Sequence, residues 1–219
     1  ADSFVANIGG DKGVCVAAFN KLTGETVWEM KHAWGASYAS PILRDIQGKP
    51  TLIVFAGGRS YPPHGGLLLL DPETGELRSE FPWRATKVNS VNATTPTVLP
   101  NNQILITETY TEGGVLLQVG EDFSLSEVWR GPEFKCHWMQ PHFVDGYLYA
   151  FTGRNEPDAG LDCWDAVTGK RKWREEFFWK TEIQGRQFGW SFFRGSILRA
   201  DGKFITLGEM GTLALMDLT

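Results

Sequence analysis

Residues 163–173 read CWDAVTGKRKW, and residues 18–28 read AFNKLTGETVW. Both segments follow one pattern: a small residue, a variable residue, Asp or Asn, two variable residues, Thr-Gly, three variable residues and Trp. A partial copy at residues 69–79 reads LLDPETGELRS, with Ser79 in place of the Trp. Copies that keep the same order of residue types indicate an internal structural repeat, which fixes the choice of fold before any single element does.

Two further copies are incomplete. The copy around Glu121 keeps Trp129 but has Ser124-Leu125 in place of Thr-Gly, and a fifth begins at Leu215, four residues before the sequence ends. The Asp, Asn or Glu positions of the five copies are 20, 71, 121, 165 and 217, so the repeat returns every 44 to 52 residues. A period of about 40–50 residues is typical of a four-stranded β-propeller blade.

The rest of each unit predicts short strands joined by tight turns. Asp145-Gly146 and Asp201-Gly202 have the composition of two-residue hairpin turns. We therefore expect an all-β fold, a β-propeller of four-stranded antiparallel blades, with three whole blades and two partial ones and no closed ring. The expected units of this single domain are residues 1–30, 31–83, 84–131, 132–180 and 181–219.

The repeated residues have a physical role in this prediction. The Gly supplies a positive φ in the turn before the outer strand, and the Asp or Asn and the Thr bind local backbone. The Trp offers a large flat ring to bury between blades, so we expect Trp28 and Trp173 to be buried at blade boundaries. The predicted docking residues are Asn20, Thr23, Gly24, Trp28, Asp71, Thr74, Gly75, Trp129, Asp165, Thr168, Gly169 and Trp173.

This pattern resembles the tryptophan-docking motif of the PQQ-like, or quinoprotein-like, β-propellers. That family includes PQQ-dependent alcohol dehydrogenases and BamB-like assembly lipoproteins of the outer membrane. The resemblance extends over nearly the whole chain and implies the fold more strongly than a function. It also implies a periplasmic or secreted location and a ring completed by the remaining blades of a longer chain, or by another protein. Ser79 and Ser124-Leu125 depart from the motif.

Composition excludes several classes of protein. The formal net charge of −5 argues against a nucleic-acid groove, and no run of about 18 apolar residues predicts a transmembrane segment. Three cysteines make no disulfide framework; we expect buried thiols, with a single Cys136–Cys163 bridge as the alternative. No metal site is expected. His137 and His142 are five positions apart on an expected strand, and this spacing places their side chains on opposite sides of the strand.

Loops at one end of the blades carry the candidate ligand-binding residues. They are Arg59, His64, Glu108, His137, Trp138, Arg154 and Glu209. Arg59 and Arg154 occupy equivalent positions after a Gly. Two such arginines fit a carboxylate or phosphate; the alternative is that each pairs with an acidic residue of the next blade, Glu108 or Glu209.

Two functions compete at this point. The repeat alone predicts a non-catalytic binding or scaffold module of the cell envelope, or the equivalent domain of a larger membrane protein, with no cofactor and no catalytic residue. The alternative, implied by the resemblance, is a PQQ-dependent dehydrogenase fragment using PQQ with calcium. The adjacent Cys pair of many such enzymes is absent from the sequence.

Overall fold

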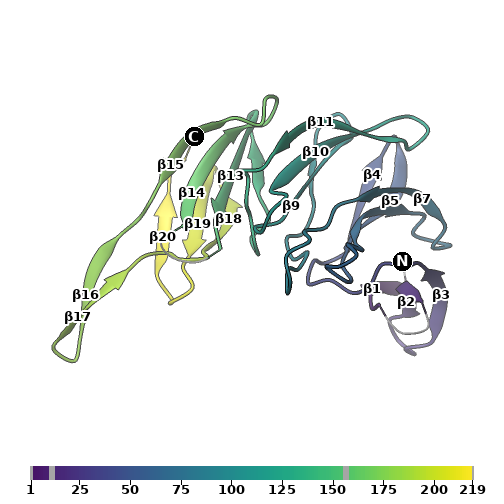
Figure 1. The fold of residues 1–219 in the computed structure, drawn as a ribbon, viewed down its shortest axis with the longest axis horizontal. Helices are drawn as coiled ribbons and strands as arrows, with labels where there is room; N and C mark the ends of the chain where they lie inside the picture. Colours follow the sequence, from purple (N-terminus) through teal and green to yellow (C-terminus); the bar gives the residue numbers. More distant parts are fainter. Residues whose placement is uncertain (1, 10–12, 155–157, 219) are drawn as a thin grey trace.

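Twenty β-strands and no helix make up the residues that the computed structural model describes, which are 2–9, 13–154 and 158–218 (Figure 1). The first sheet contains β1 (Ser3–Asn7), β2 (Val14–Asn20) and β3 (Thr26–Lys31), and the second contains β4 (Ile42–Ile46), β5 (Lys49–Ala56), β6 (Gly66–Leu70) and β7 (Leu77–Pro82). The third contains β8 (Thr97–Leu99), β9 (Gln103–Thr107), β10 (Gly114–Val119) and β11 (Leu125–Gly131), and the fourth β12 (His142–Val144), β13 (Tyr147–Thr152), β14 (Gly160–Asp165) and β15 (Arg171–Glu175). A hairpin of β16 (Trp179–Ile183) and β17 (Arg186–Trp190) precedes the last sheet, β18 (Ser196–Ala200), β19 (Lys203–Leu207) and β20 (Leu213–Met216).

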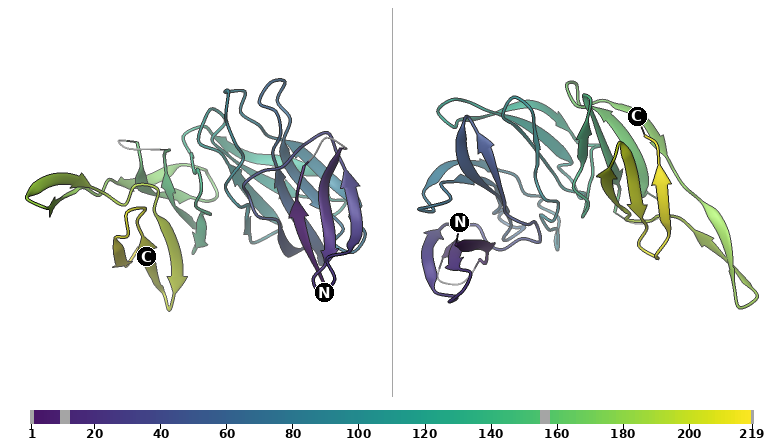
Figure 2. Two further views of the ribbon diagram at one scale, coloured as in Figure 1. Left: turned by 90° about the horizontal axis from the view of Figure 1, so that it is seen from below. Right: turned by 180° about the vertical axis from the view of Figure 1, so that it is seen from behind.

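The sheets follow one another in chain order along an open arc, with the two termini at opposite ends (Figures 1 and 2). Every strand pairs antiparallel with its neighbour in the chain. The expected architecture of four-stranded antiparallel blades is therefore confirmed. Three sheets have four strands, the first and last have three, and no closure of the ring is seen within the described residues.

The cores lie between consecutive sheets, because the middle strands are buried on both faces. In β5, Ile53 and Phe55 belong to a cluster shared with the third sheet, whereas Leu52 and Val54 belong to one shared with the first. Side chains alternate across a strand, so one apolar run serves two interfaces. Each fully buried aliphatic or aromatic side chain contributes about 1.5–3 kcal/mol.

Strand order divides the connections between two ends of the array. Turns after the first and third strands of each four-stranded sheet lie at one end. In the turns after the first strand, both residues of the pair, such as Asp145-Gly146, have positive φ as their composition predicts. The loops between the second and third strands lie at the other end, together with the segments that join one sheet to the next. We call this second end the loop end.

The motif turns have the expected local hydrogen bonds. Asp165 Oδ1 accepts from the backbone N–H groups of Val167 and Thr168 at 3.1 and 2.9 Å, and Asn20 and Asp71 accept in the same way. Gly169 has φ +65° and its N–H donates to Asp165 O at 2.9 Å. The turn therefore closes on itself through the Asp side chain and the left-handed Gly.

Two Trp rings lie over the glycine of the next sheet's turn. Trp28 Nε1 donates to Pro72 O at 3.2 Å, and Trp129 Nε1 donates to Ala166 O at 2.8 Å. A Cβ on Gly169 would lie 2.6 Å from the Trp129 ring. The glycine is thus required twice, for its φ and for the space that the ring occupies.

The interface between the second and third sheets is built differently. Ser79 stands where a Trp is expected, and Phe123, from the turn of the third sheet, is buried there instead. The guanidinium carbon of Arg78 lies 5.0 Å from the centre of the Phe123 ring. This turn is one residue shorter than the others, and Gly120, not Glu121, takes the position of the Asp or Asn.

One expectation for the C-terminal part was wrong. Trp173 is 38% exposed and contacts Tyr149, because the described residues after β20 include no turn on which its ring can lie. Arg186–Trp190 forms β17 of a separate hairpin that extends away from the sheets (Figure 2). Its turn residues Gln184 and Gly185 both have positive φ, which stabilises a two-residue hairpin.

The three cysteines are buried and unpaired, so the alternative of a Cys136–Cys163 bridge is not realised. Burial raises the pKa of Cys15 to about 11 and that of Cys136 well above its ordinary value. Residues 2–9, 13–154 and 158–218 contain no helix long and apolar enough to cross a membrane.

Candidate binding surface at the loop end

Backbone hydrogen bonds tie the loop end together. Gly35 and Gly57 exchange two hydrogen bonds of 2.7 and 3.1 Å, and Gly153 N–H donates to Lys135 O at 2.7 Å. In each case the segment entering a sheet is bound to the loop within that same sheet. Side chains from several sheets are therefore held at one end of the array on fixed backbone.

An aromatic group spans this end, and we call it the aromatic ridge: Tyr38, Tyr110, His137, Trp138 and Arg154. The Tyr38 and Trp138 rings meet edge to face at a centroid distance of 5.8 Å, and Trp138 packs on His137 at 4.3 Å. The Arg154 guanidinium lies 5.0 Å from the centre of the Tyr110 ring. Tyr38 is 69% exposed and Trp138 44% exposed, whereas His137 is buried.

His137 supports the ridge as a neutral group. Burial, together with the positive charges of Arg154 and Arg194, lowers its pKa to about 4. Its Nε2 lies 3.3 Å from the hydroxyl of Tyr110. A neutral ring in this position packs under Trp138 without the desolvation cost of a cation.

Glu108, predicted as a ligand-binding residue, is turned into its own loop. Its two carboxylate oxygens accept the backbone N–H groups of Tyr110, Thr111, Glu112 and Gly113, and the residue is 1% exposed. A carboxylate with four amide donors shapes a tight loop. In this structure Glu108 positions Tyr110.

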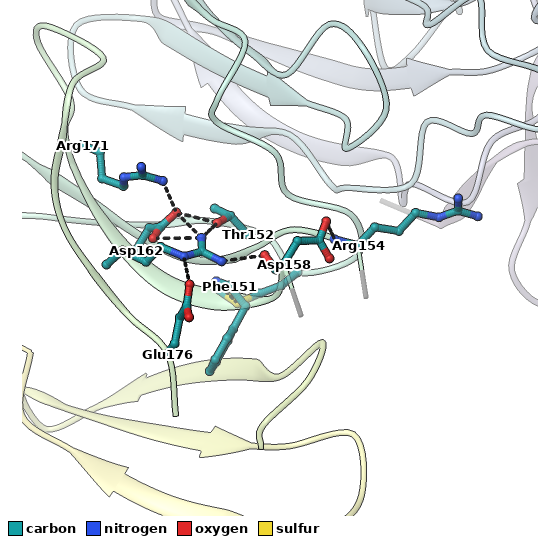
Figure 3. Close-up of polar contacts among 9 residues, drawn as sticks. Phe151, Thr152, Arg154, Asp158, Asp162, Arg171 and Glu176 are labelled. Atoms are coloured by element: carbon teal, nitrogen blue, oxygen red, sulfur yellow. Dashed lines mark hydrogen bonds and ion pairs between the residues drawn. The ribbon is translucent and has the colours of Figure 1, made fainter. Parts of the chain in front are cut away.

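Arg154 is held by a buried ionic cluster beneath its loop (Figure 3). Asp162 is fully buried, and its Oδ2 lies 2.5 Å from Thr152 Oγ1 and 3.2 Å from Arg174 Nη1. Arg174 also donates to Asp158 O at 2.6 Å, and the Arg154 N–H donates to Asp158 Oδ2 at 3.3 Å. The Arg154 side chain points away from this cluster (Figure 3), and the residue is exposed.

Burial raises the pKa of Asp162, and the Thr152 hydrogen bond and the charges of Arg174 and Arg171 offset part of that effect. This cluster was not predicted. Its sequence signal is Asp162, which lies between the apolar residues Leu161 and Cys163 of β14 and is followed by two arginines on β15.

Arg59 and His64 line a separate cleft of about 480 Å³ beside His32 and Trp34. The two come from one tight loop, in which the His64 N–H donates to Arg59 O at 2.9 Å. His32 Nδ1 accepts the Trp34 N–H, so its Nε2 carries the hydrogen that faces Glu80 Oε2 at 2.7 Å.

The alternative in which Arg59 and Arg154 pair with acidic residues is not formed within the described residues. Glu209 forms its ion pair with Arg194, and Glu108 is occupied by backbone groups. Arg154 lies on Tyr110 instead. The partners of these side chains could not be assigned from the sequence, because neighbouring segments supply them.

Three of the candidate ligand-binding residues, Arg59, Glu108 and Arg154, do not converge on one point that could hold PQQ with calcium. The Glu108 oxygens are buried against amide donors, and Arg59 and Arg154 belong to loops two sheets apart, in different surroundings. Within the described part of the chain, no group of three or more His, Cys, Asp or Glu is placed to hold a metal ion. We therefore derive no redox step from these side chains.

Comparison with known proteins places the chain among β-propellers. Neither a family model nor a curated protein sequence matches it. The computationally designed protein Ika4 matches over 90% of this chain and all of its own, at 12% identity and a TM-score of 0.56. The quinohemoprotein alcohol dehydrogenase of Comamonas testosteroni matches over all of this chain, at 13% identity and a TM-score of 0.51.

BamB from Moraxella catarrhalis matches over 97% of this chain and 76% of its own, at 16% identity and a TM-score of 0.44. This chain spans 45% of the quinohemoprotein dehydrogenase. At such identities the likeness establishes the fold and leaves the function to the site.

Proposed function

We propose that this chain is a non-catalytic binding module of a periplasmic or secreted protein, and that its aromatic ridge binds a partner protein. The observation that carries the proposal is the exposed pair Tyr38 and Trp138, at 69% and 44% exposure, on a rigid support. Tyr, Trp and Arg are the residues most enriched at energetically dominant interface positions. Arg154 adds a charge at the same ridge.

Rigidity favours binding at this surface. Trp138 stacks on the buried His137, and the Tyr38 N–H donates to Asn92 O at 3.1 Å. A ring that is already oriented loses little conformational entropy when a partner covers it. Exposed aromatic surface that is held in place in this way is typical of an interface and not of a mobile loop.

The exposed apolar face of the last sheet also indicates a partner. On the outer face of the last sheet, five aliphatic side chains are exposed in adjacent register positions: Leu198, Ile205, Leu207, Leu213 and Leu215. In the third sheet, Ile104, Leu105 and Ile106 of β9 are buried on both faces. The proposal therefore includes a further propeller sheet, from a longer chain or from another protein, that covers the last sheet.

The test is site-specific photo-crosslinking in the source cells. A benzoylphenylalanine replaces Tyr38 in one variant and Tyr147 in the other. Tyr147 is 36% exposed and follows the Asp145-Gly146 turn at the opposite end of the array, so it is a matched control. We expect one discrete crosslinked protein from position 38 and none from position 147. No adduct at position 38, or the same adducts at both positions, would contradict the proposal.

A further inference from the structure

A cavity of about 300 Å³ lies at the loop end, beside the second sheet. Its walls are residues 36–38, Gly57-Gly58, Arg84 and residues 90–92. The backbone is closely packed here, since a Cβ on Gly57 would lie 2.3 Å from Ala36 O. Much of the wall is therefore closely packed main chain, and Tyr38 and Arg84 are its two long side chains.

Arg84 brings to this wall a positive charge that makes no direct ion pair with a described residue. Its guanidinium donates to Ser90 Oγ at 2.6 Å, Ser90 O at 2.5 Å and Gly58 O at 3.1 Å, all of them neutral acceptors. No ion pair of Arg84 occurs within the described residues. Glu108 acts on it at longer range, but backbone amides occupy the Glu108 oxygens.

Burial lowers the pKa of Arg84, which expresses the cost of holding this charge away from water. A half-buried cation beside a cavity attracts an anion more strongly than a cation in water does, because the surroundings screen it less. The Arg84 Nε is also buried without a hydrogen-bond partner in the described structure. These features favour a carboxylate as the group that enters the cavity.

Asn92 supplies a complementary acceptor. The residue is 1% exposed, and its Nδ2 donates to Ala56 O at 2.8 Å and Trp83 O at 3.1 Å. These bonds fix the amide, and its Oδ1 is buried with no donor. Buried polar atoms are nearly always satisfied in native proteins. Ser37 Oγ accepts the Ala39 N–H at 3.2 Å, so its own O–H can donate to a ligand.

We propose that this cavity binds a small carboxylate that carries an N–H or O–H donor next to the acid group. A free hydroxy acid and the C-terminal residue of a peptide share this chemistry. The carboxylate lies toward Arg84 and Ser37, and the donor lies toward Asn92. Tyr38 of the ridge also lines this cavity. The proposed ligand contacts are made by Arg84, Ser37 and Asn92, so the inference does not depend on whether the ridge binds a partner protein.

The test is a calorimetric titration of the whole chain with sodium L-lactate and, separately, with N-acetyl-alanyl-alanine. Methyl lactate and the amide of the dipeptide are the controls that lack the acid group. We expect saturable binding of at least one acid, and at least tenfold weaker binding of its uncharged control. Binding of lactate alone identifies a free acid as the ligand type, and binding of the dipeptide alone identifies a chain terminus.

Variants connect the binding to the cavity. Arg84→Gln removes the charge, and Ser37→Leu fills the space while leaving Arg84 intact; each is expected to weaken binding at least tenfold. Arg199→Gln, an exposed arginine of β18, is the matched control and leaves binding unchanged. Absence of saturable binding by both acids overturns the inference. So does binding that persists in Ser37→Leu, in a protein whose melting curve matches that of the unmodified chain.

Discussion

Substitution of Gly169 by Ala separates the two roles of the motif glycine. Gly169 has φ +65°, a conformation that costs an L-residue about 1–2 kcal/mol. Its Cβ would also lie 2.6 Å from Cδ2 of Trp129, so the indole must move. Movement of the ring weakens its 2.8 Å hydrogen bond to Ala166 O and exposes part of the indole to solvent.

The expected cost is the sum of these effects. Loss of the hydrogen bond contributes about 1 kcal/mol, and partial exposure of the ring is a fraction of the roughly 3–5 kcal/mol that a Trp→Ala change costs. Gly169→Ala is therefore expected to lower the free energy of unfolding by about 3 kcal/mol. Gly24 is the equivalent residue of the first sheet, with φ +74° and nothing within 4 Å of a Cβ. Gly24→Ala is expected to cost only about 1 kcal/mol, from its φ.

Urea unfolding followed by far-ultraviolet circular dichroism measures both variants, and Trp fluorescence reports the indole. Gly146→Ala, at φ +88° in the same sheet as Gly169 and with no atom near its Cβ, controls for local unfolding of the fourth sheet. Equal losses in Gly169→Ala and Gly146→Ala would refute the packing role of the Trp ring. An unchanged Trp emission in Gly169→Ala would refute it as well.

Three further predictions concern the loop end. The pKa of His137 falls from 6.5 in the unfolded chain to about 4 when folded, so the unfolded state binds the extra proton between these pH values. The free energy of unfolding therefore falls as pH drops from about 6.5 toward 4, by up to roughly 3 kcal/mol. His137→Phe should flatten this part of a pH series of urea melts, and an unchanged slope would contradict the assignment. Asp162→Asn removes the buried carboxylate of the cluster and leaves Arg174 with only the exposed Glu176 as an ionic partner. It should cost about 3 kcal/mol in the same assay, and a loss below about 1 kcal/mol would show that the cluster is dispensable. With PQQ, calcium and an alcohol, the chain should not reduce an artificial electron acceptor, whereas reduction that disappears in Arg59→Ala/Arg154→Ala would favour the dehydrogenase.

The sequence predicted the blade architecture because the repeat encodes local geometry. Asp165 and Gly169 close a turn with bonds to their own neighbours, so their spacing alone indicates that turn. The alternation along β5 likewise indicates a strand buried on both faces. Features of this kind depend on residues only a few positions apart.

Features that depend on the neighbouring sheet were not predictable in the same way. Burial of Trp173 depends on a turn from the sheet that follows, and Phe123 replaces a Trp from the opposite side of its interface. In the ridge, Tyr38 meets Trp138 across 100 positions of sequence, a contact that no local pattern specifies. Glu108 was predicted to bind a ligand from its place in a loop, and in the structure its oxygens accept backbone N–H groups of that loop, which its spacing does not reveal.

The most direct measurement is the affinity of the purified chain for the protein crosslinked at position 38, determined by calorimetry. Tyr38→Ala/Trp138→Ala removes both exposed rings of the ridge, and Tyr147→Ala removes one ring from the opposite end. Energetically dominant aromatic residues contribute at least about 2 kcal/mol each, so the double variant should bind at least a hundredfold more weakly, while Tyr147→Ala binds as the unmodified chain does. Equal affinity of the double variant and the unmodified chain, with both folded, would contradict a binding role for the ridge.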